Sequence, residues 1–227
     1  MTRPDVHMEL IEGLAAGRLS PPLTLLARSY AEANPAAGDA LSRLDSAGAA
    51  LLESAEPAEL DDDALATALA MIDALEAGAG EAGSATAPDR LSAAGRAADM
   101  SAELIRLPDS LRDRIVESGA DWRFAAPGVR RLVLDETGDA KAELLRIEPG
   151  HGSPSHTHTG REFTLVLTGS FFDGHNRYRA GEVCETGPET THRPIADPGE
   201  VCYALAVTEG SLKFKGPLGA VQRLFGG

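Results

Sequence analysis

Aromatic residues are scarce in this chain of 227 residues, at 4 % of the composition, and it contains a single Trp. It has only two cysteines, Cys184 and Cys202, without the C-x-x-C spacing of metal-binding or redox pairs. The sequence therefore predicts no disulfide framework. We expect both thiols to be buried on strands of a reduced, cytoplasmic protein.

Long apolar runs are also missing. No run approaches the ~20 residues that a transmembrane helix needs. The first ten residues, MTRPDVHMEL, lack the charged and then apolar layout of a signal peptide. We therefore expect no association with a membrane.

Basic residues are outnumbered, with 21 Lys and Arg against 35 Asp and Glu, for a formal net charge of -14. Phosphate contacts need clustered Lys and Arg, so direct binding to nucleic acid is not expected. The acidic excess is concentrated in residues 1–107, which hold 18 acidic and 7 basic residues. This asymmetry indicates two units, of which the acidic one suits a basic protein partner.

The first part of the chain is helical in pattern. Leucines at helical spacing, with proline, glycine and acidic residues at the ends, predict four helices: 5–17, 20–34, 39–53 and one that begins at 61–63 and breaks at 78–80. Alanine favours these helices but buries little area, so their core is thin and a partner could complete it. We interpret residues 1–77 as a small helical bundle and the Gly/Ala/Ser-rich stretch that follows, within 78–107, as a linker.

The pattern changes after Leu107. A short helix at 109–118 is followed by β-type runs separated by Gly and Pro turns, at 129–135, 142–147, 163–168, 169–173, 181–186, 201–207 and 211–215. Short strands at regular spacing predict a sandwich or barrel. The predicted fold class is thus a two-domain α + β protein, with an all-β domain at 108–227.

A histidine cluster opens this β domain. His156 and His158 stand at i and i+2, so on an extended strand their imidazoles share one face. Glu162 can join them after a turn at Thr159-Gly160, and His192 would come from a distant strand. Three imidazoles and one carboxylate suit a single divalent ion such as Zn, Fe, Mn or Ni.

This layout closely resembles the cupin superfamily, whose first motif is G(X)5HXH(X)3,4E(X)6G. Every fixed position matches between Gly150 and Gly169. The second motif, G(X)5PXG(X)2H, matches in part, because Gly187 replaces the proline and Glu189 the glycine. The resemblance implies a cupin barrel, or jelly roll, over residues 108–227.

No separate catalytic constellation stands out. Tyr178, Glu185 and Tyr203 lie on predicted strands, where they can face the cavity, the surface or the core. His151 is close to the cluster in sequence, but the motif does not require it. We therefore assign four metal ligands and no catalytic residue.

The chain as a whole resembles the ChrR-type anti-sigma factors. The resemblance rests on Leu107-Pro108, Trp122-Arg123, the stretch 126–130 and the stretch 49–53, besides the metal motif. It implies that a helical domain holds an extracytoplasmic-function sigma factor inactive. It further implies that a metal-bearing cupin, with zinc favoured, is needed to respond to a signal, which in the best-known branch is singlet oxygen or organic peroxide.

The chain departs from this family at a second zinc site. The helical domain of the family binds zinc through an early His and an HxxxCxxC motif. His7 takes the early position here, but Tyr30, Asn34 and Ala37 replace the other three ligands. We therefore predict no zinc in this domain, with apolar side chains tying the helices together instead.

Three hypotheses follow. The first is a cytoplasmic transcription regulator that binds a sigma factor through residues 1–77 and senses stress through its cupin. The second is a metal-dependent cupin enzyme of the dioxygenase or isomerase type, with a helical appendage. The third is a module that binds a small acid or sugar without chemistry. The sequence leaves the oligomeric state open, including a homo-oligomer.

Overall fold

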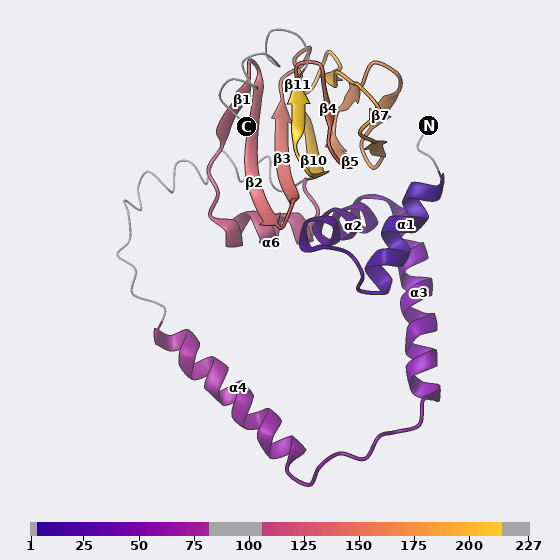
Figure 1. The fold of residues 1–227 in the computed structure, drawn as a ribbon, viewed down its shortest axis with the longest axis vertical. Coiled ribbons are helices and arrows are strands. Elements are labelled where there is room, and N and C mark those ends of the chain that lie inside the picture. The colour runs from indigo at the N-terminus through magenta and orange to yellow at the C-terminus, as the bar shows by residue number, and fades with distance from the viewer. Residues whose placement is uncertain (1–3, 82–105, 215–227) are drawn as a thin grey trace. The chain divides into compact units, whose positions relative to one another are not determined.

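The computed structural model describes residues 4–81 and 106–214 (Figure 1). Its helices are α1 (Pro4–Ala15), α2 (Pro21–Ala33), α3 (Pro35–Ser54), α4 (Ala64–Glu81) and α6 (Asp109–Ser118). Its strands are β1 (Arg123–Ala126), β2 (Val129–Thr137), β3 (Ala140–Ile147), β4 (His156–His158), β5 (Glu162–Thr168), β6 (Ser170–Phe172), β7 (Arg177–Arg179), β8 (Val183–Thr186), β9 (Ile195–Ala196), β10 (Cys202–Glu209) and β11 (Leu212–Phe214). The fold is α + β, as predicted, and none of the described helices is long and apolar enough to cross a membrane.

The predicted helices are present, with two differences at their ends. α3 begins at Pro35, four residues before the predicted start, because the Asn34 Oδ1 accepts hydrogen bonds from the N–H groups of Ala36 and Ala37 at 3.1 and 3.2 Å. Proline then occupies the first helical position, where its missing N–H costs nothing. α4 continues to Glu81 through the glycines at which a break was predicted, since a single Gly costs a helix only about 1 kcal/mol relative to Ala.

The strands form three antiparallel sheets. The largest has the order β1-β2-β3-β10-β5-β8, and the smaller ones pair β11 with β4 and place β6 between β7 and β9. Every β-type run predicted from the sequence is found, and so is the extended strand expected at His156 and His158, β4, whereas β1, β7 and β9 were missed. Those three span only two to four residues, too few for an alternating pattern to be recognised. The closed barrel stays a prediction.

One face of the large sheet carries a row of aliphatic side chains. Leu132, Leu144, Leu205, Leu165 and Val183 are cross-strand neighbours in that order, and each is fully buried. α2 contacts four of the strands in this sheet and also packs against α6. The row therefore lies under helices, and each buried leucine contributes roughly 1.5–3 kcal/mol to stability.

The described residues fall into two compact units. Those up to Ala47 group with those from Arg106 onward, and those from Gly48 to Glu81 form the second unit. Within the first unit the Asn34 side-chain amide donates to the Gly181 carbonyl oxygen at 3.0 Å, which ties the end of α2 to the turn before β8. Most of the expected linker lies outside the described residues, so the domains 1–77 and 108–227 stay a prediction.

Candidate metal centre

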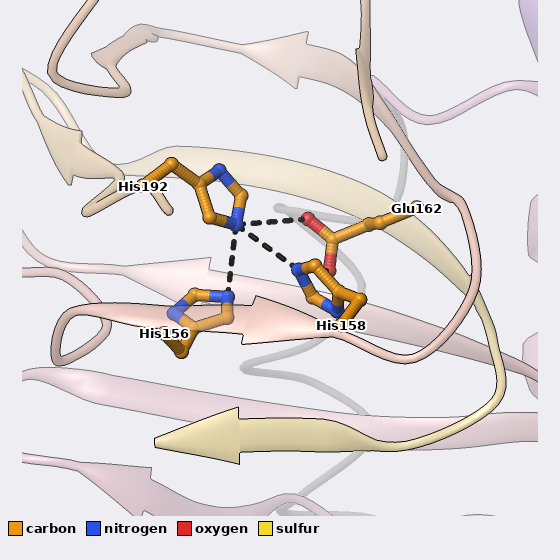
Figure 2. A group of neighbouring side chains, drawn as sticks. All are labelled: His156, His158, Glu162 and His192. Carbon is orange, nitrogen blue, oxygen red and sulfur yellow. Dashed lines mark hydrogen bonds and ion pairs between the residues drawn. The ribbon is translucent and has the colours of Figure 1, made fainter. Parts of the chain in front are cut away.

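The four predicted ligands lie together in the structure. One ligand atom from each of His156, His158, Glu162 and His192 falls within 4.8 Å of the others, and all four residues are buried. The His192 Nε2 is 3.0 Å from the His156 Nε2 and 3.1 Å from the His158 Nε2. The Glu162 carboxylate completes the group, 3.3 Å from the His158 Nε2 and 3.8 Å from the His192 Nε2. Figure 2 shows the four side chains directed toward one another.

Strand pairing explains how three of these residues meet. His156 and His158 are the ends of β4, so both point to the buried face while Thr157 points away. β11 pairs with β4 and holds it in register. His156 and His192 exchange two backbone hydrogen bonds, at 3.0 and 3.1 Å, which brings the distant histidine to the cluster.

A tight turn carries the fourth ligand into place. Gly160 lies between β4 and β5, and a Cβ atom there would come within 2.3 Å of the Glu209 carbonyl oxygen. Only glycine fits such a close backbone approach. Glu162 then begins β5 opposite Thr208 on β10 and Thr186 on β8.

Hydrogen bonds around the cluster orient the ligand atoms. The Pro154 carbonyl oxygen, which can only accept, lies 2.7 Å from the His156 Nδ1. The proton of this ring is therefore on Nδ1, and the Nε2 lone pair is free to bind a metal. Thr164 and Thr208 each donate a hydroxyl to a different oxygen of Glu162 at 3.3 Å. Sequence analysis missed both threonines, although Thr164 is at the same-face position i+2 from Glu162.

Burial keeps the three imidazoles neutral at pH 7. It is the main cause that lowers the pKa of His158 to about 4 and that of His192 to about 3, with neighbouring imidazoles adding to both shifts. The pKa of His156 is lowered for the same first reason. Burial has the opposite effect on Glu162 and raises the pKa of its carboxyl group to about 7. Neutral imidazoles are the form that binds a metal, and a bound cation would release the proton of Glu162.

The donor set fits one divalent ion. Metal–donor bonds of about 2.1 Å place two donor atoms about 3.0 Å apart at a right angle and about 3.4 Å apart at a tetrahedral angle. Three of the four distances above lie in this range. The His158 Nδ1 is buried without a hydrogen-bond partner among the described residues, so this ring is held by packing and by the contacts of its Nε2 with His192 and Glu162.

Other residues singled out in the sequence lie away from the cluster. His151 is exposed, and its Nδ1 contacts the Pro149 carbonyl oxygen at 3.1 Å. Tyr203 accepts a hydrogen bond from the Arg146 Nε at 2.9 Å on a different part of the sheet. His7 contacts the Tyr30 hydroxyl through its Nδ1, so the two residues that the resemblance aligns with a second zinc site are joined by a hydrogen bond here.

The two cysteines are free and buried, as predicted. Burial is the main cause that raises the pKa of both Cys184 and Cys202 to about 12. Because the thiolate is the reactive form, neither residue is suited to a thiol-based redox response.

Arg161, the residue before the predicted ligand Glu162, connects the start of β5 to α1. Its guanidinium group donates two parallel hydrogen bonds to the Glu9 carboxylate, at 2.7 and 2.9 Å. It also bonds Glu185 at 2.8 Å and lies over the ring of Phe163, 4.5 Å from the ring centre. This arrangement explains why Glu185 does not face the metal cluster.

Comparison with known proteins places the chain in a family. Residues 112–212 match the family model of the ChrR cupin-like domain. The chain is 32 % identical to the anti-sigma-E factor ChrR of Cereibacter sphaeroides over 214 residues, which cover 93 % of this chain and 92 % of that protein. It also matches the crystal structure of Rhodobacter sphaeroides ChrR in complex with SigE, with a TM-score of 0.66, 29 % identity, and coverage of 91 % of this chain and 97 % of that one. The chain is therefore a member of the ChrR family of cupin-containing anti-sigma factors.

Proposed function

We propose that this chain sequesters an extracytoplasmic-function sigma factor in the cytoplasm through residues 1–77 and senses an oxidative or chemical signal through a metal-bearing cupin. The observation that carries the proposal is similarity along nearly the whole chain to a protein whose solved structure holds SigE. Two features of the chain support it further.

The first feature is the apolar stripe of α4. Leu65, Leu69, Ile72 and Leu75 recur at helical spacing, and each is between 52 % and 73 % exposed. Water disfavours such a stripe, so helices that carry one normally pack against a partner. A sigma-factor surface would supply the missing contact.

The second feature is charge. Residues 1–107 carry 18 acidic against 7 basic side chains, and three of the acidic ones, Asp61–Asp63, directly precede α4. A partner with a basic face would be attracted over several ångströms before contact, which speeds association and favours it over acidic proteins.

Capture of the partner tests this proposal. The tagged full-length chain is purified from its own cells, and the proteins that remain bound are identified by mass spectrometry. We expect a stoichiometric sigma factor, which is lost in the double variant Leu69→Asp, Ile72→Asp. Val116→Asp is the control, because Val116 is an apolar residue on α6 that is more exposed than Leu69 and Ile72. Recovery of the wild-type chain without any sigma factor would contradict the proposal.

The metal content of the purified chain tests the second part of the proposal, namely that the sensory cupin holds a metal. We propose that His156, His158, Glu162 and His192 hold one divalent ion, with zinc favoured and iron, manganese or nickel compatible with the same donors. Elemental analysis of the purified chain should find about one equivalent, absent in His158→Ala. His151→Ala should retain it, since His151 lies outside the cluster.

A further inference from the structure

A cavity opens beside the metal cluster on the inner face of the large sheet. It has a volume of 350 Å³, and His156, Glu162 and His192 form part of its wall. Phe124, which also lines it, is 75 % exposed, so the cavity reaches the surface at β1. Its volume is within the range of pockets that bind small molecules.

Small side chains create this space. Ala204 and Ala206 on β10 and Thr164 on β5 form part of the cavity wall. On the opposite face of the same strands, Leu205 and Leu165 fill the core. Protein interiors are normally packed without such volumes, and larger residues at 204 and 206 would close this one.

The far walls are apolar except for one charged pair. Leu145, Ile147 and Phe171 supply aliphatic and aromatic surface. Arg131 also lines the cavity and pairs with Glu143 at 2.9 Å through its Nη1. The Arg131 Nε is buried and has no hydrogen-bond partner among the described residues. An oxygen atom in the cavity would satisfy this donor.

Strand register places this donor on the same face of the large sheet as Glu162. Glu143 and Thr164 both face Ala206, and the next residues on that face of β10 and β5 are Thr208 and Glu162. Glu143 is thus one row of side chains along the strands from Glu162, and Arg131, which pairs with Leu145, is one row further. Arg131 and the metal ligands Glu162, His156 and His192 all line the same cavity.

Charge balance indicates the chemical class of ligand that the cavity favours. A divalent ion held by three neutral imidazoles and one carboxylate retains a net charge of +1, and the linked ion pairs of Arg131, Glu143, Lys141 and Glu136 add none. The cavity therefore favours a monoanionic oxygen ligand with an apolar body.

We propose that this cavity binds a small organic carboxylate, attracted by the positive charge at the metal position and by the Arg131 Nε donor, with its apolar body against Leu145, Ile147 and Phe171. The inference rests on the proposed function in one respect, namely that the cupin holds a divalent metal. It names the chemical class of the effector that the sensory domain recognises.

Binding of simple acids to the zinc-loaded full-length chain tests the proposal. Benzoate and hexanoate are the probes, and benzyl alcohol and hexanol are their uncharged matches. We expect each acid to bind by calorimetry and to raise the midpoint of thermal unfolding, whereas the alcohols bind at least tenfold more weakly. Failure of both acids to bind, or equal binding of acids and alcohols, would overturn the proposal.

Two variants locate the site. Ala206→Leu fills the cavity and should abolish acid binding, and Arg131→Gln should weaken it at least tenfold, with one equivalent of zinc retained in both. Arg130→Gln is the control, because Arg130 is the exposed neighbour of Arg131. If Ala206→Leu does not fold, the Arg131 and Arg130 variants decide alone. Acid binding by the two cavity variants at the wild-type affinity would refute the assignment.

The assay contains no sigma factor, so its result is separate from that of partner capture. A chain that binds acids and captures no sigma factor keeps the cavity proposal and refutes sequestration. A zinc-loaded chain that binds no acid refutes the cavity proposal alone. A chain that does not retain zinc overturns both the cavity proposal and the sensory part of the proposed function.

Discussion

Acid should destabilise the metal-free chain, because three histidines are buried in their neutral form. Below pH 6.5 the unfolded chain protonates these imidazoles at their ordinary pKa. The folded chain does not, since burial lowers the pKa of His158 to about 4 and of His192 to about 3, and also lowers that of His156. The unfolded state therefore binds more protons, and the free energy of unfolding falls as the pH drops from about 6.5 toward 4.

Glu162 opposes this trend. Its pKa is raised to about 7 in the folded chain, so between pH 7 and its ordinary value the folded state holds one more proton than the unfolded state. His158 and His192 against one carboxyl group leave a net uptake of about one proton on unfolding near pH 5, and His156 adds to this uptake. At about 1.4 kcal/mol per proton and pH unit, the chain should lose at least about 1 kcal/mol between pH 6 and pH 5.

Urea unfolding with a chelator present, followed by fluorescence, measures this loss. Trp122 is the single tryptophan and lies 6.3 Å from the Tyr203 ring, so it reports on the cupin. His158→Gln should reduce the loss by about 1.4 kcal/mol, and Glu162→Gln should increase it by about as much. The control His151→Gln should behave as the wild type, because His151 is exposed. Equal losses in the wild type and in His158→Gln would refute the argument from burial.

Three further predictions concern the packing of the chain. A double-mutant cycle of Glu9→Gln and Arg161→Gln should give a coupling of about 0.5–1 kcal/mol that shrinks in high salt, because the bidentate pair is partly exposed; a coupling independent of salt would contradict an ionic link between α1 and the cupin. Leu205→Ala should cost about 2–5 kcal/mol in urea unfolding, because this side chain is fully buried under α2, and a loss below about 1 kcal/mol would show that the site collapses around the smaller residue. Gly152→Ala should cost about 1–3 kcal/mol in the same assay, since its Cβ would lie 1.9 Å from the Pro194 carbonyl oxygen; unchanged stability would mean that this backbone contact is not maintained in solution.

Much of the fold was predictable because its signals are local. Helix α6 has the predicted bounds, Asp109–Ser118, since Pro108 precedes it and Gly119 ends it in a left-handed conformation. The start of α3 was wrong by four residues, because the capping role of Asn34 depends on where its side chain points. β9, with only two residues, owes its existence to pairing with β6, which no local pattern reveals.

The sequence by itself determined the metal cluster and the family. Alternation along a strand places His156 and His158 on one face, and the spacing of Glu162 and His192 matches a motif that the structure then brings together. These facts depend on short-range geometry and on residue identity. The linear order of residues contains both the short-range geometry and the residue identities, so the sequence alone was sufficient.

Only the tertiary structure decided the contacts between residues that are far apart in the sequence. The bridge between Glu9 and Arg161 joins residues 152 positions apart, and the cavity exists because register sets Ala204 and Ala206 beside Arg131, Glu143 and the metal ligands. Long-range neighbours of this kind arise from the packing of the helices on one face of the sheet and from strand order on the other. No segment of the sequence contains that information, because each contact depends on where the distant partner folds.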